Sequence, residues 1–192
     1  MDTTTKVPFQ YSGIGRLIKK ALHTKLGAFV GFYLGLSGFN RMEVVITRAD
    51  GTVEKQHSFN SRVDAGAALS ASLISGTTLG GLTSPAAAKY IAVSSSSLTP
   101  AKGDTTLTGE ISTNGLGRAL GTAGTYTAPS ALDGAASYVL SKTFSATGTA
   151  TVVSAAIFDA ASAGNMFVEA NLASSATVNN GDSLTINWTV NL

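Results

Sequence analysis

Alternation of apolar and polar residues with a period of two is the feature that most constrains how this chain can fold. It is clearest over residues 184–192, where every second residue is apolar and those between are threonine or asparagine. The apolar positions are Leu184, Ile186, Trp188, Val190 and Leu192. This pattern predicts a strand that buries one face, with Trp188 directed into a core. A strand at such a position stays ordered when it is paired, so we expect it inside a sheet.

Turn residues separate further strand-like runs. Asp50-Gly51 lies between the runs 42–47 and 52–59, and an aspartate-glycine pair in this position predicts a β-hairpin over residues 42–59. Thr147-Gly148-Thr149 separates the runs 137–146 and 150–158, which predicts a second hairpin.

The spacing of these runs predicts the fold class. Additional strand-like segments lie at residues 90–93, 118–121, 125–127 and 165–172. Many short strands joined by glycine-rich turns are typical of an antiparallel β-sandwich. We therefore expect a mainly β protein, with a jelly-roll-like sandwich over residues 41–192 and an N-terminal arm over residues 1–40.

Two short segments have helical features. Residues 64–74 begin with an aspartate suited to an N-cap and end before Ser75-Gly76, so a short helix is expected there, with Leu69, Leu73 and Ile74 on one face. The residues that follow, 77–88, are expected to form a loop. Asp104 opens a second segment, residues 104–111, for which a helix-like turn capped by Asp104 is expected.

The stretch from Lys89 to Arg118 carries a family resemblance. The residues that carry it are Tyr90 to Val93, Thr99-Pro100-Ala101, Gly103-Asp104-Thr105-Thr106-Leu107, Glu110 and Arg118, with Asp64 to Leu69 before them and Asn180 to Ile186 after them. They resemble structural proteins of tailed-bacteriophage virions, of the tail-fibre-like or decoration type with a C-terminal β-sandwich. The resemblance implies a virion protein, assembled in the host cytoplasm, whose partners are other virion proteins. Capsid decoration, a neck or connector ring, and tail or fibre attachment all remain open.

Composition narrows the function classes. Only 12% of the residues are charged, well below the roughly 25% typical of soluble domains, so part of the surface is expected to be covered in a homo-oligomer or larger assembly. There is no cysteine, which excludes disulfides, thiolate metal sites and cysteine nucleophiles. The longest apolar run, Leu26 to Phe39, contains four glycines and is shorter than the roughly 20 residues that a membrane helix needs. No membrane span is expected.

Positive charge is concentrated in the first third of the chain. Residues 1–63 hold nine basic and four acidic groups, a net charge of +5, whereas the remainder has a net charge of −3. Residues 14–41 contain no acid, so an anionic partner would be favoured there. The pattern of residues 14–33 fits a basic amphipathic helix, while the glycines after Leu26 favour a strand or an extended arm.

Two interpretations of this N-terminal segment remain open. In the first it is an arm or helix that binds a partner subunit, a membrane surface or packaged nucleic acid. The residues expected to bind the partner are Arg16, Lys19, Lys20, Lys25, Phe29, Phe32 and Tyr33. In the second it is a core-facing helix with a solvated basic face. Nucleic acid is not expected as the main partner, because aromatic and basic residues do not interleave in the cluster from Lys19 to Lys25.

No catalytic, cofactor or metal site is expected. The chain has no phosphate-binding loop, nucleophile elbow or zinc-protease motif. Asp104 and Glu110 could imitate a glycosidase pair, but a helix cap and an ion pair between Glu110 and Arg118 are the preferred roles. The two histidines, His23 and His57, are far apart in the sequence and are interpreted as solvated or partner-facing. Asp182 is interpreted as a turn residue.

Two functional classes follow. The first is a non-enzymatic virion structural protein that binds neighbouring subunits. The alternative is a carbohydrate- or receptor-binding sandwich on a host-attachment structure. Sugar sites usually present exposed aromatic side chains, so exposure of Trp188 beside Tyr126 or Tyr138 would favour the alternative.

Overall fold

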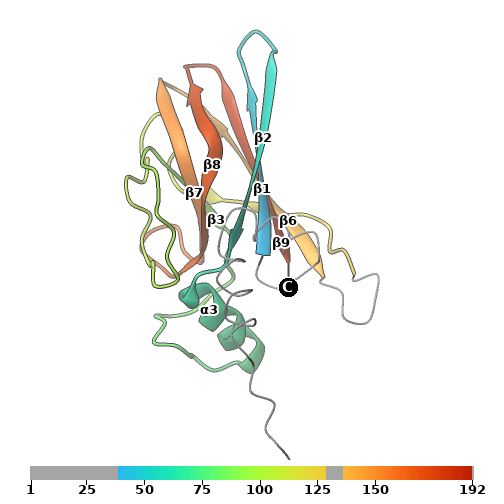
Figure 1. The fold of residues 1–192 in the computed structure, drawn as a ribbon, viewed down its shortest axis with the longest axis vertical. Helices are drawn as coiled ribbons and strands as arrows, with labels where there is room; N and C mark the ends of the chain where they lie inside the picture. The colour runs from blue at the N-terminus through green and yellow to red at the C-terminus, as the bar shows by residue number, and fades with distance from the viewer. Residues whose placement is uncertain (1–38, 129–135, 192) are drawn as a thin grey trace, which may run out of the picture.

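The protein is an antiparallel β-sandwich. The computed structural model describes residues 39–128 and 136–191, and Figure 1 shows two sheets packed face to face with one helix at one end. The five-stranded sheet A has the order β2-β1-β9-β6-β5, and the four-stranded sheet B has the order β4-β3-β7-β8. The elements are β1 (Phe39–Thr47), β2 (Val53–Ser61), α3 (Asp64–Ser75), β3 (Tyr90–Ser94), β4 (Ala119–Leu120), β5 (Thr122–Ala123), β6 (Ser137–Ser145), β7 (Ala150–Phe158), β8 (Met166–Val178) and β9 (Ser183–Asn191). The expected fold class is confirmed.

Strand β9 forms the centre of sheet A. Its apolar residues Leu184, Ile186, Trp188 and Val190 are fully buried, as the alternation predicts, while Leu192 lies outside the described residues. The strand pairs with β1 on one side and with β6 on the other. Burial of every second side chain against sheet B is the main hydrophobic contribution of this strand to stability.

The hairpin expected over residues 42–59 is confirmed. Strands β1 and β2 pair from Phe39↔Ser61 to Thr47↔Val53, and the turn between them is closed by a hydrogen bond from the backbone N–H of Arg48 to Thr52 O (2.8 Å). Gly51 has a φ of 88°, a conformation that glycine adopts without steric cost.

The hairpin expected over residues 137–158 is wrong. Strand β6 belongs to sheet A and β7 to sheet B, so the connection at residues 146–149 crosses between the sheets. The backbone N–H groups of Ala146 and Thr147 donate to Asp182 O (2.8 Å) and Asn114 O (3.0 Å), and not across a tight turn. The physical reason is burial: β7 is buried on both faces from Ser154 to Phe158, whereas β6 leaves residues on one face exposed. The two strands therefore suit different layers.

The expected helix is present, with two corrections. It spans Asp64–Ser75 and ends at Gly76, whose φ of 67° is left-handed. Its N-cap is Val63 instead of Asp64, and no side chain caps it. Of the three apolar residues expected on one face, Leu69 is buried but Leu73 and Ile74 are exposed. Residues 77–88 form a loop, as expected.

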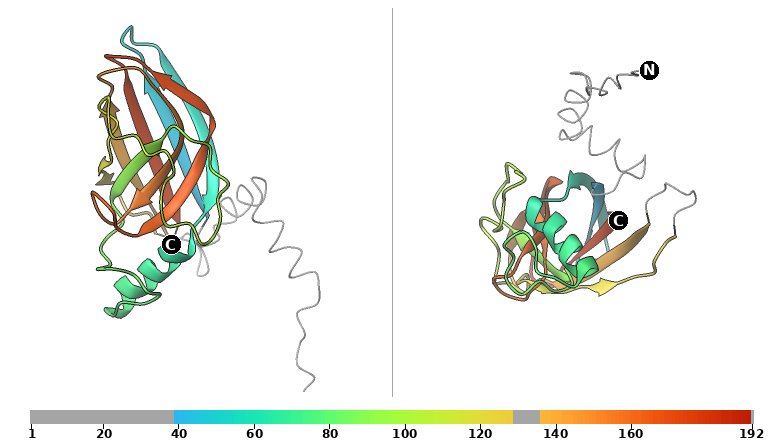
Figure 2. Two further views of the ribbon diagram at one scale, coloured as in Figure 1. Left: turned by 90° about the vertical axis from the view of Figure 1, so that its left-hand side faces the viewer. Right: turned by 90° about the horizontal axis from the view of Figure 1, so that it is seen from below.

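Residues 95–118, which we call the strap, run over the outer face of sheet B, where Leu98 and Leu107 pack, and Leu116 near the end of the strap reaches the main core. Figure 2 shows the strap crossing in front of this sheet. The helix-like turn expected over residues 104–111 is wrong, because this part of the strap contains only turns and bends and one bridge, Ser94↔Glu110. On sheet A, by contrast, the outward-facing residues of β9 remain partly exposed.

The sandwich has two distinct ends. In Figure 1, α3, the start of β1 and the end of β9 lie at one end, and the β1–β2 turn lies at the other. The pairing Arg41↔Thr189 agrees with this placement. The part of the chain that the structure describes has no helix with both the length and the apolar character needed to cross a bilayer.

Candidate functional site

The strap is packed on sheet B through a small apolar cluster. Leu107 of the strap is buried together with Ala92, Ala156, Phe158 and Met166 from the outer face of the sheet. This cluster is separate from the main core, which lies between the two sheets. Sheet B is therefore buried on both faces, so the strap is an integral layer of the fold.

Polar side chains on the strands hold the strap backbone in place. The Asn171 side chain accepts a hydrogen bond from the backbone N–H of Leu98 (2.7 Å) and donates one to Leu98 O (2.8 Å). The Ser154 hydroxyl donates to Ser96 O (2.8 Å). These bonds satisfy strap groups that would otherwise be costly to bury.

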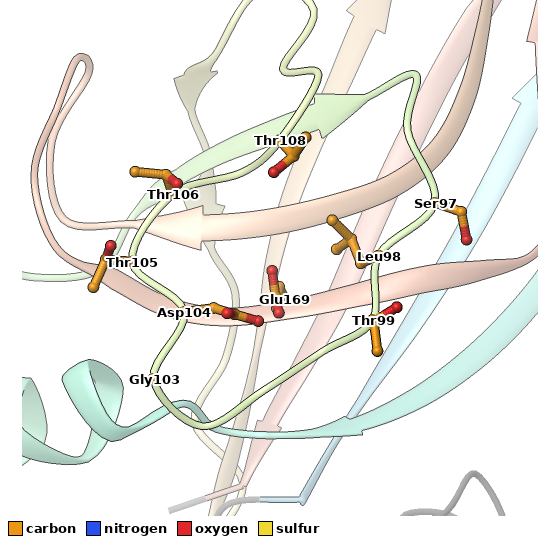
Figure 3. Close-up of a pocket in the computed structure, with 9 residues that line it drawn as sticks. All are labelled: Ser97, Leu98, Thr99, Gly103, Asp104, Thr105, Thr106, Thr108 and Glu169. Carbon is orange, nitrogen blue, oxygen red and sulfur yellow. The ribbon is translucent and has the colours of Figure 1, made fainter.

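A recess of about 300 Å³ lies between the strap and β8. Its lining is mainly polar, with several hydroxyl groups and two carboxyl groups. Figure 3 shows the residues that line it, Ser97, Leu98, Thr99, Gly103, Asp104, Thr105, Thr106, Thr108 and Glu169. None of them is aromatic or cationic. This recess is the candidate functional site.

Two carboxyl groups meet in the recess. Glu169, on β8, is only 2% exposed, and Figure 3 shows the Asp104 side chain of the strap pointing toward it. Burial, followed by a hydrogen bond with Asp104 and by the Asp104 charge, raises the pKa of Glu169 to about 8. The same hydrogen bond, with a second one from the backbone N–H of Ala101, lowers the pKa of Asp104. At neutral pH Glu169 therefore holds a proton and shares it with the Asp104 carboxylate.

Asp104 has a different structural role from the one expected. No helix begins at this residue, so it is not an N-cap. Its carboxylate accepts a hydrogen bond from the backbone N–H of Ala101 (2.7 Å), and its own N–H donates to Ala101 O (3.2 Å). Asp104 thereby closes the turn at residues 101–104 and brings its carboxylate to Glu169.

Glu110 and Arg118 are joined by a two-point ion pair within the strap. Arg118 Nε and Nη2 donate to the two carboxylate oxygens of Glu110, at 2.9 and 2.6 Å. The guanidinium also lies 3.6 Å from the centre of the Phe158 ring and donates to Ala163 O (2.7 Å). Paired and stacked in this way, Arg118 connects the strap to the loop that joins β7 and β8.

Glu169 was not singled out from the sequence. It is the one acid in an otherwise apolar run, residues 166–170, and all five of these residues are buried. A lone acid inside a buried strand is a signal that a partner must cover it. The period of two places it on the face opposite Val168 and Ala170, but nothing local in the sequence indicates that the strap covers that face.

The carboxyl pair does not have the geometry of a glycoside hydrolase. Such enzymes separate their two carboxyl groups by roughly 5 to 9.5 Å to leave room for the sugar or a water, whereas Asp104 and Glu169 are in hydrogen-bond contact. Glu110, the other partner considered for Asp104, is bound to Arg118. Among residues 39–128 and 136–191, no three histidine or acidic side chains are grouped so that they could hold a metal ion.

A second hollow, of about 650 Å³, lies at the end of the β1–β2 hairpin. Asp182 accepts backbone N–H bonds from Asn179 and Ala49, each 2.9 Å long, and these bonds, with Arg48 beside it, hold the pKa of Asp182 below its ordinary value. Arg48 also pairs with Glu54 at 2.7 Å. The charged groups here connect the β1–β2 turn to the β8–β9 turn.

The remaining residues singled out from the sequence are not part of the recess. Trp188 is fully buried in the main core, whereas Tyr126 is exposed and Tyr138 is half-buried, so no exposed pair of Trp188 with a tyrosine exists. On sheet A, His57 Nε2 lies 3.9 Å from Glu43 Oε1. His23 and the expected arm residues, Arg16, Lys19, Lys20, Lys25, Phe29, Phe32 and Tyr33, lie outside the described residues.

Fold and site together define a β-sandwich protein whose charged side chains mainly connect segments of its own chain. Residues 65–189, more than half of the chain, match the family described as Podophage GP4 fiber I protein gp80. The chain belongs to this family of phage fibre proteins. Because fibres are parts of the virion, the family match indicates a virion component. No curated protein and no solved structure matches it. The matched region begins within α3 and leaves out the β1–β2 hairpin, although β1 is paired with β9 inside it.

Proposed function

We propose that the protein is a non-enzymatic structural subunit of a phage fibre or of its attachment, assembled in the host cytoplasm together with other virion proteins. The observation that carries this proposal is the family match, which extends from α3 to β9. The site geometry supports it, because Asp104, Glu110 and Arg118 all bind other parts of the same chain. Such contacts stabilise a fold.

The N-terminal segment is the part that we propose to join neighbouring subunits. It combines basic and aromatic residues, Arg16, Lys19, Lys20, Lys25, Phe29, Phe32 and Tyr33. The segment precedes β1, which starts at the end of the sandwich where α3 lies (Figure 1). Contacts made by residues 1–38 therefore leave the opposite end, with the β1–β2 turn, free to point away from the attachment.

Deleting residues 1–38 tests this proposal. We expect the shortened protein to keep its sandwich, because the paired strands begin at Phe39, and to be absent from purified particles. Circular dichroism and a melting curve would report the fold, and quantitative mass spectrometry of particles would report incorporation. A matched variant that replaces only Arg16, Lys19, Lys20 and Lys25 with alanine separates the charged contribution from the apolar one. Incorporation of the deletion variant at the normal level would refute the arm as the joining element.

A second candidate function is binding of a saccharide receptor in the recess. The recess volume of about 300 Å³ fits the lower end of the roughly 300–1,000 Å³ range of small-molecule sites, and its hydroxyl and carboxyl groups could bind sugar hydroxyls. The absence of an aromatic side chain from the lining weighs against it. Calorimetric titration with host surface polysaccharide, for the natural protein and for Thr106→Val, would test it; equal binding by both proteins would exclude the recess.

A further inference from the structure

The second half of α3 and the loop after it form an exposed surface without charge. Residues 65–88 contain no acidic or basic side chain. Within them Leu73 is 51%, Ile74 87% and Leu79 40% exposed. Seven large apolar side chains of the described residues are exposed, and these are three of the seven. We call Leu73, Ile74 and Leu79 the α3 patch.

The inner side of α3 explains why the patch faces outward. Gly66, Leu69 and Ser72, spaced by three residues, are the buried positions of the helix. Gly66 lies so close to β8 that a Cβ atom there would be 2.0 Å from Phe167 O. The Ser72 hydroxyl accepts a hydrogen bond from the backbone N–H of Leu79 (2.9 Å), which holds Leu79 next to the end of the helix. The patch is therefore a fixed surface.

The location of the patch indicates what could cover it. It lies at the end of the sandwich where β1 begins (Figure 1), so residues 1–38 join the sandwich at that end. The last part of this segment, residues 26–38, is also free of charge and contains Phe29, Phe32 and Tyr33. Phe32 is seven positions before Phe39, where β1 begins, and seven extended residues reach roughly 23 Å, which is enough to contact a neighbouring subunit.

We propose that the α3 patch of one subunit binds residues 26–36 of a second copy of this chain. The inference rests on the proposed function and names the surface that receives the arm. Both contact surfaces are apolar and uncharged, so burying them costs no charge desolvation. Every copy carries one arm and one patch, which gives a head-to-tail contact that can close into a ring.

The natural absence of cysteine permits a direct test by disulfide trapping in the full-length protein. One variant carries Phe32→Cys and a second carries Ile74→Cys; the two are mixed and oxidised, and the mixed disulfide is measured by mass spectrometry. The control replaces the second variant with Leu120→Cys, because Leu120 is also exposed, at 54%, but lies on β4. We expect the yield of mixed disulfide between Phe32→Cys and Ile74→Cys to exceed that of the control by at least about tenfold. The reason is that a bound arm has a raised local concentration at the patch.

Two results would overturn the inference. One is equal trapping by Ile74→Cys and Leu120→Cys. The other is a double variant, with both Phe32→Cys and Ile74→Cys, that forms only an internal disulfide at the mass of one chain, which would show that each arm covers its own patch.

Incorporation into particles separates this inference from the proposed function. Ile74→Asp should fold normally, because Ile74 is 87% exposed, and should be lost from particles as the deletion of residues 1–38 is. If Ile74→Asp is incorporated but the deletion variant is not, the α3 patch is not the surface that receives the arm, and the proposal that the arm joins subunits is unaffected. Incorporation of both would remove the arm and the α3 patch as joining elements, whereas absence of the natural protein from particles would refute the proposed function itself.

Discussion

Glu169 shows how a single buried acid is accommodated in this fold. It lies on the outer face of β8 beneath the strap, at 2% exposure, where an ionised carboxylate would lose most of its hydration. Retaining the proton avoids that cost, and Asp104 accepts the resulting hydrogen bond. The two residues are 65 positions apart in the sequence, so the contact exists only once the strap lies on sheet B.

The titration of Glu169 predicts a pH dependence of stability. Its pKa is 4.5 when unperturbed and about 8 in the folded protein, so between these values the folded state binds more protons than the unfolded state. The free energy of unfolding should therefore fall as pH rises from about 4.5 to about 8. The pKa of Asp104 is lowered from 3.8 in the folded protein. Its contribution to the free energy of unfolding is therefore present above pH 3.8 and is lost as the pH falls through its pKa in the folded protein. Urea unfolding at pH 5, about 6.5 and 8 would measure the fall.

Glu169→Gln should remove this decline, because glutamine keeps a neutral hydrogen-bonding side chain without a titrating proton. The control Glu110→Gln alters the ion pair with Arg118 on the same strap and should leave the decline between pH 4.5 and 8 in place. Identical profiles for Glu169→Gln and the natural protein would contradict the assignment of the proton to Glu169.

At the level of elements, helix α3 depends on one close approach of backbone to backbone. Gly66 is the residue at the contact, and a Cβ atom there would be 2.0 Å from Phe167 O and 2.7 Å from the Arg62 side chain. Arg62 lies over the Phe167 ring at 5.7 Å and donates to the Ser70 hydroxyl at 3.0 Å. The contact of α3 with β8 therefore includes a glycine, Gly66, and Arg62, beside the buried Leu69.

Gly66→Ala should destabilise the protein although alanine favours helices. Alanine gains roughly 1 kcal/mol of intrinsic helix propensity over glycine, but the clash with a main-chain oxygen forces α3 away from β8, at a cost of about 1–3 kcal/mol or more. Gly103→Ala is the matched control, since a Cβ atom there meets nothing within 4 Å. Thermal melting of both variants checks this expectation, and an unchanged or higher melting temperature for Gly66→Ala would show that the contact of α3 with β8 can relax.

The elements themselves were predictable where their signals are local. The Asp50-Gly51 turn between two strand-like runs predicted the first hairpin, and the alternation of β9 predicted which of its side chains are buried. The prediction of a second hairpin failed at residues 146–149, because a short glycine-containing turn suits a hairpin and a crossing between sheets equally well. Which of the two forms depends on β9 and β3, the distant partners of β6 and β7.

The candidate site was less predictable for the same reason. Its strap residues lie in the stretch that carries the family resemblance, and the Glu110–Arg118 pair joins residues only eight positions apart. The recess, however, needs β8 beneath the strap. The residues next to Asp104 in the sequence predicted that it caps a helix. In the structure its carboxylate is directed to Glu169 on β8, which is too far away in the sequence for a local pattern to indicate the contact.

At the scale of the whole molecule, the ion pairs hold segments of one chain together. Arg48 connects to Glu54 and Asp182, and Arg118 to Glu110. With only 12% charged residues in the sequence, few charges remain for contacts between copies. The proposed contact between arm and α3 patch is accordingly apolar.

An assembly of this kind should respond weakly to salt. We expect the molar mass measured by light scattering to stay constant between about 50 mM and about 500 mM NaCl, because screening weakens contacts between exposed charges and not apolar ones. Dissociation at the higher concentration would instead assign the contact to the basic residues Arg16, Lys19, Lys20 and Lys25. The quadruple alanine variant, measured in parallel, would then be dissociated at both concentrations.

The central place of β9 in sheet A has a consequence for synthesis of the protein. Strand β9 pairs with β1, and the residues that meet are more than 130 positions apart, as in Thr47↔Ser183. A ribosome that adds roughly 5–20 residues per second needs about 7–28 s to cover that distance. Until β9 is made, β1 lacks the strand that separates it from β6 in the finished sheet, although β1 can already pair with β2 and β6 with β5. Any product that stops before residue 183 leaves the two pairs of strands unconnected. Prematurely terminated chains cannot complete sheet A, so a virion that selects folded subunits would take up only those that have passed this point.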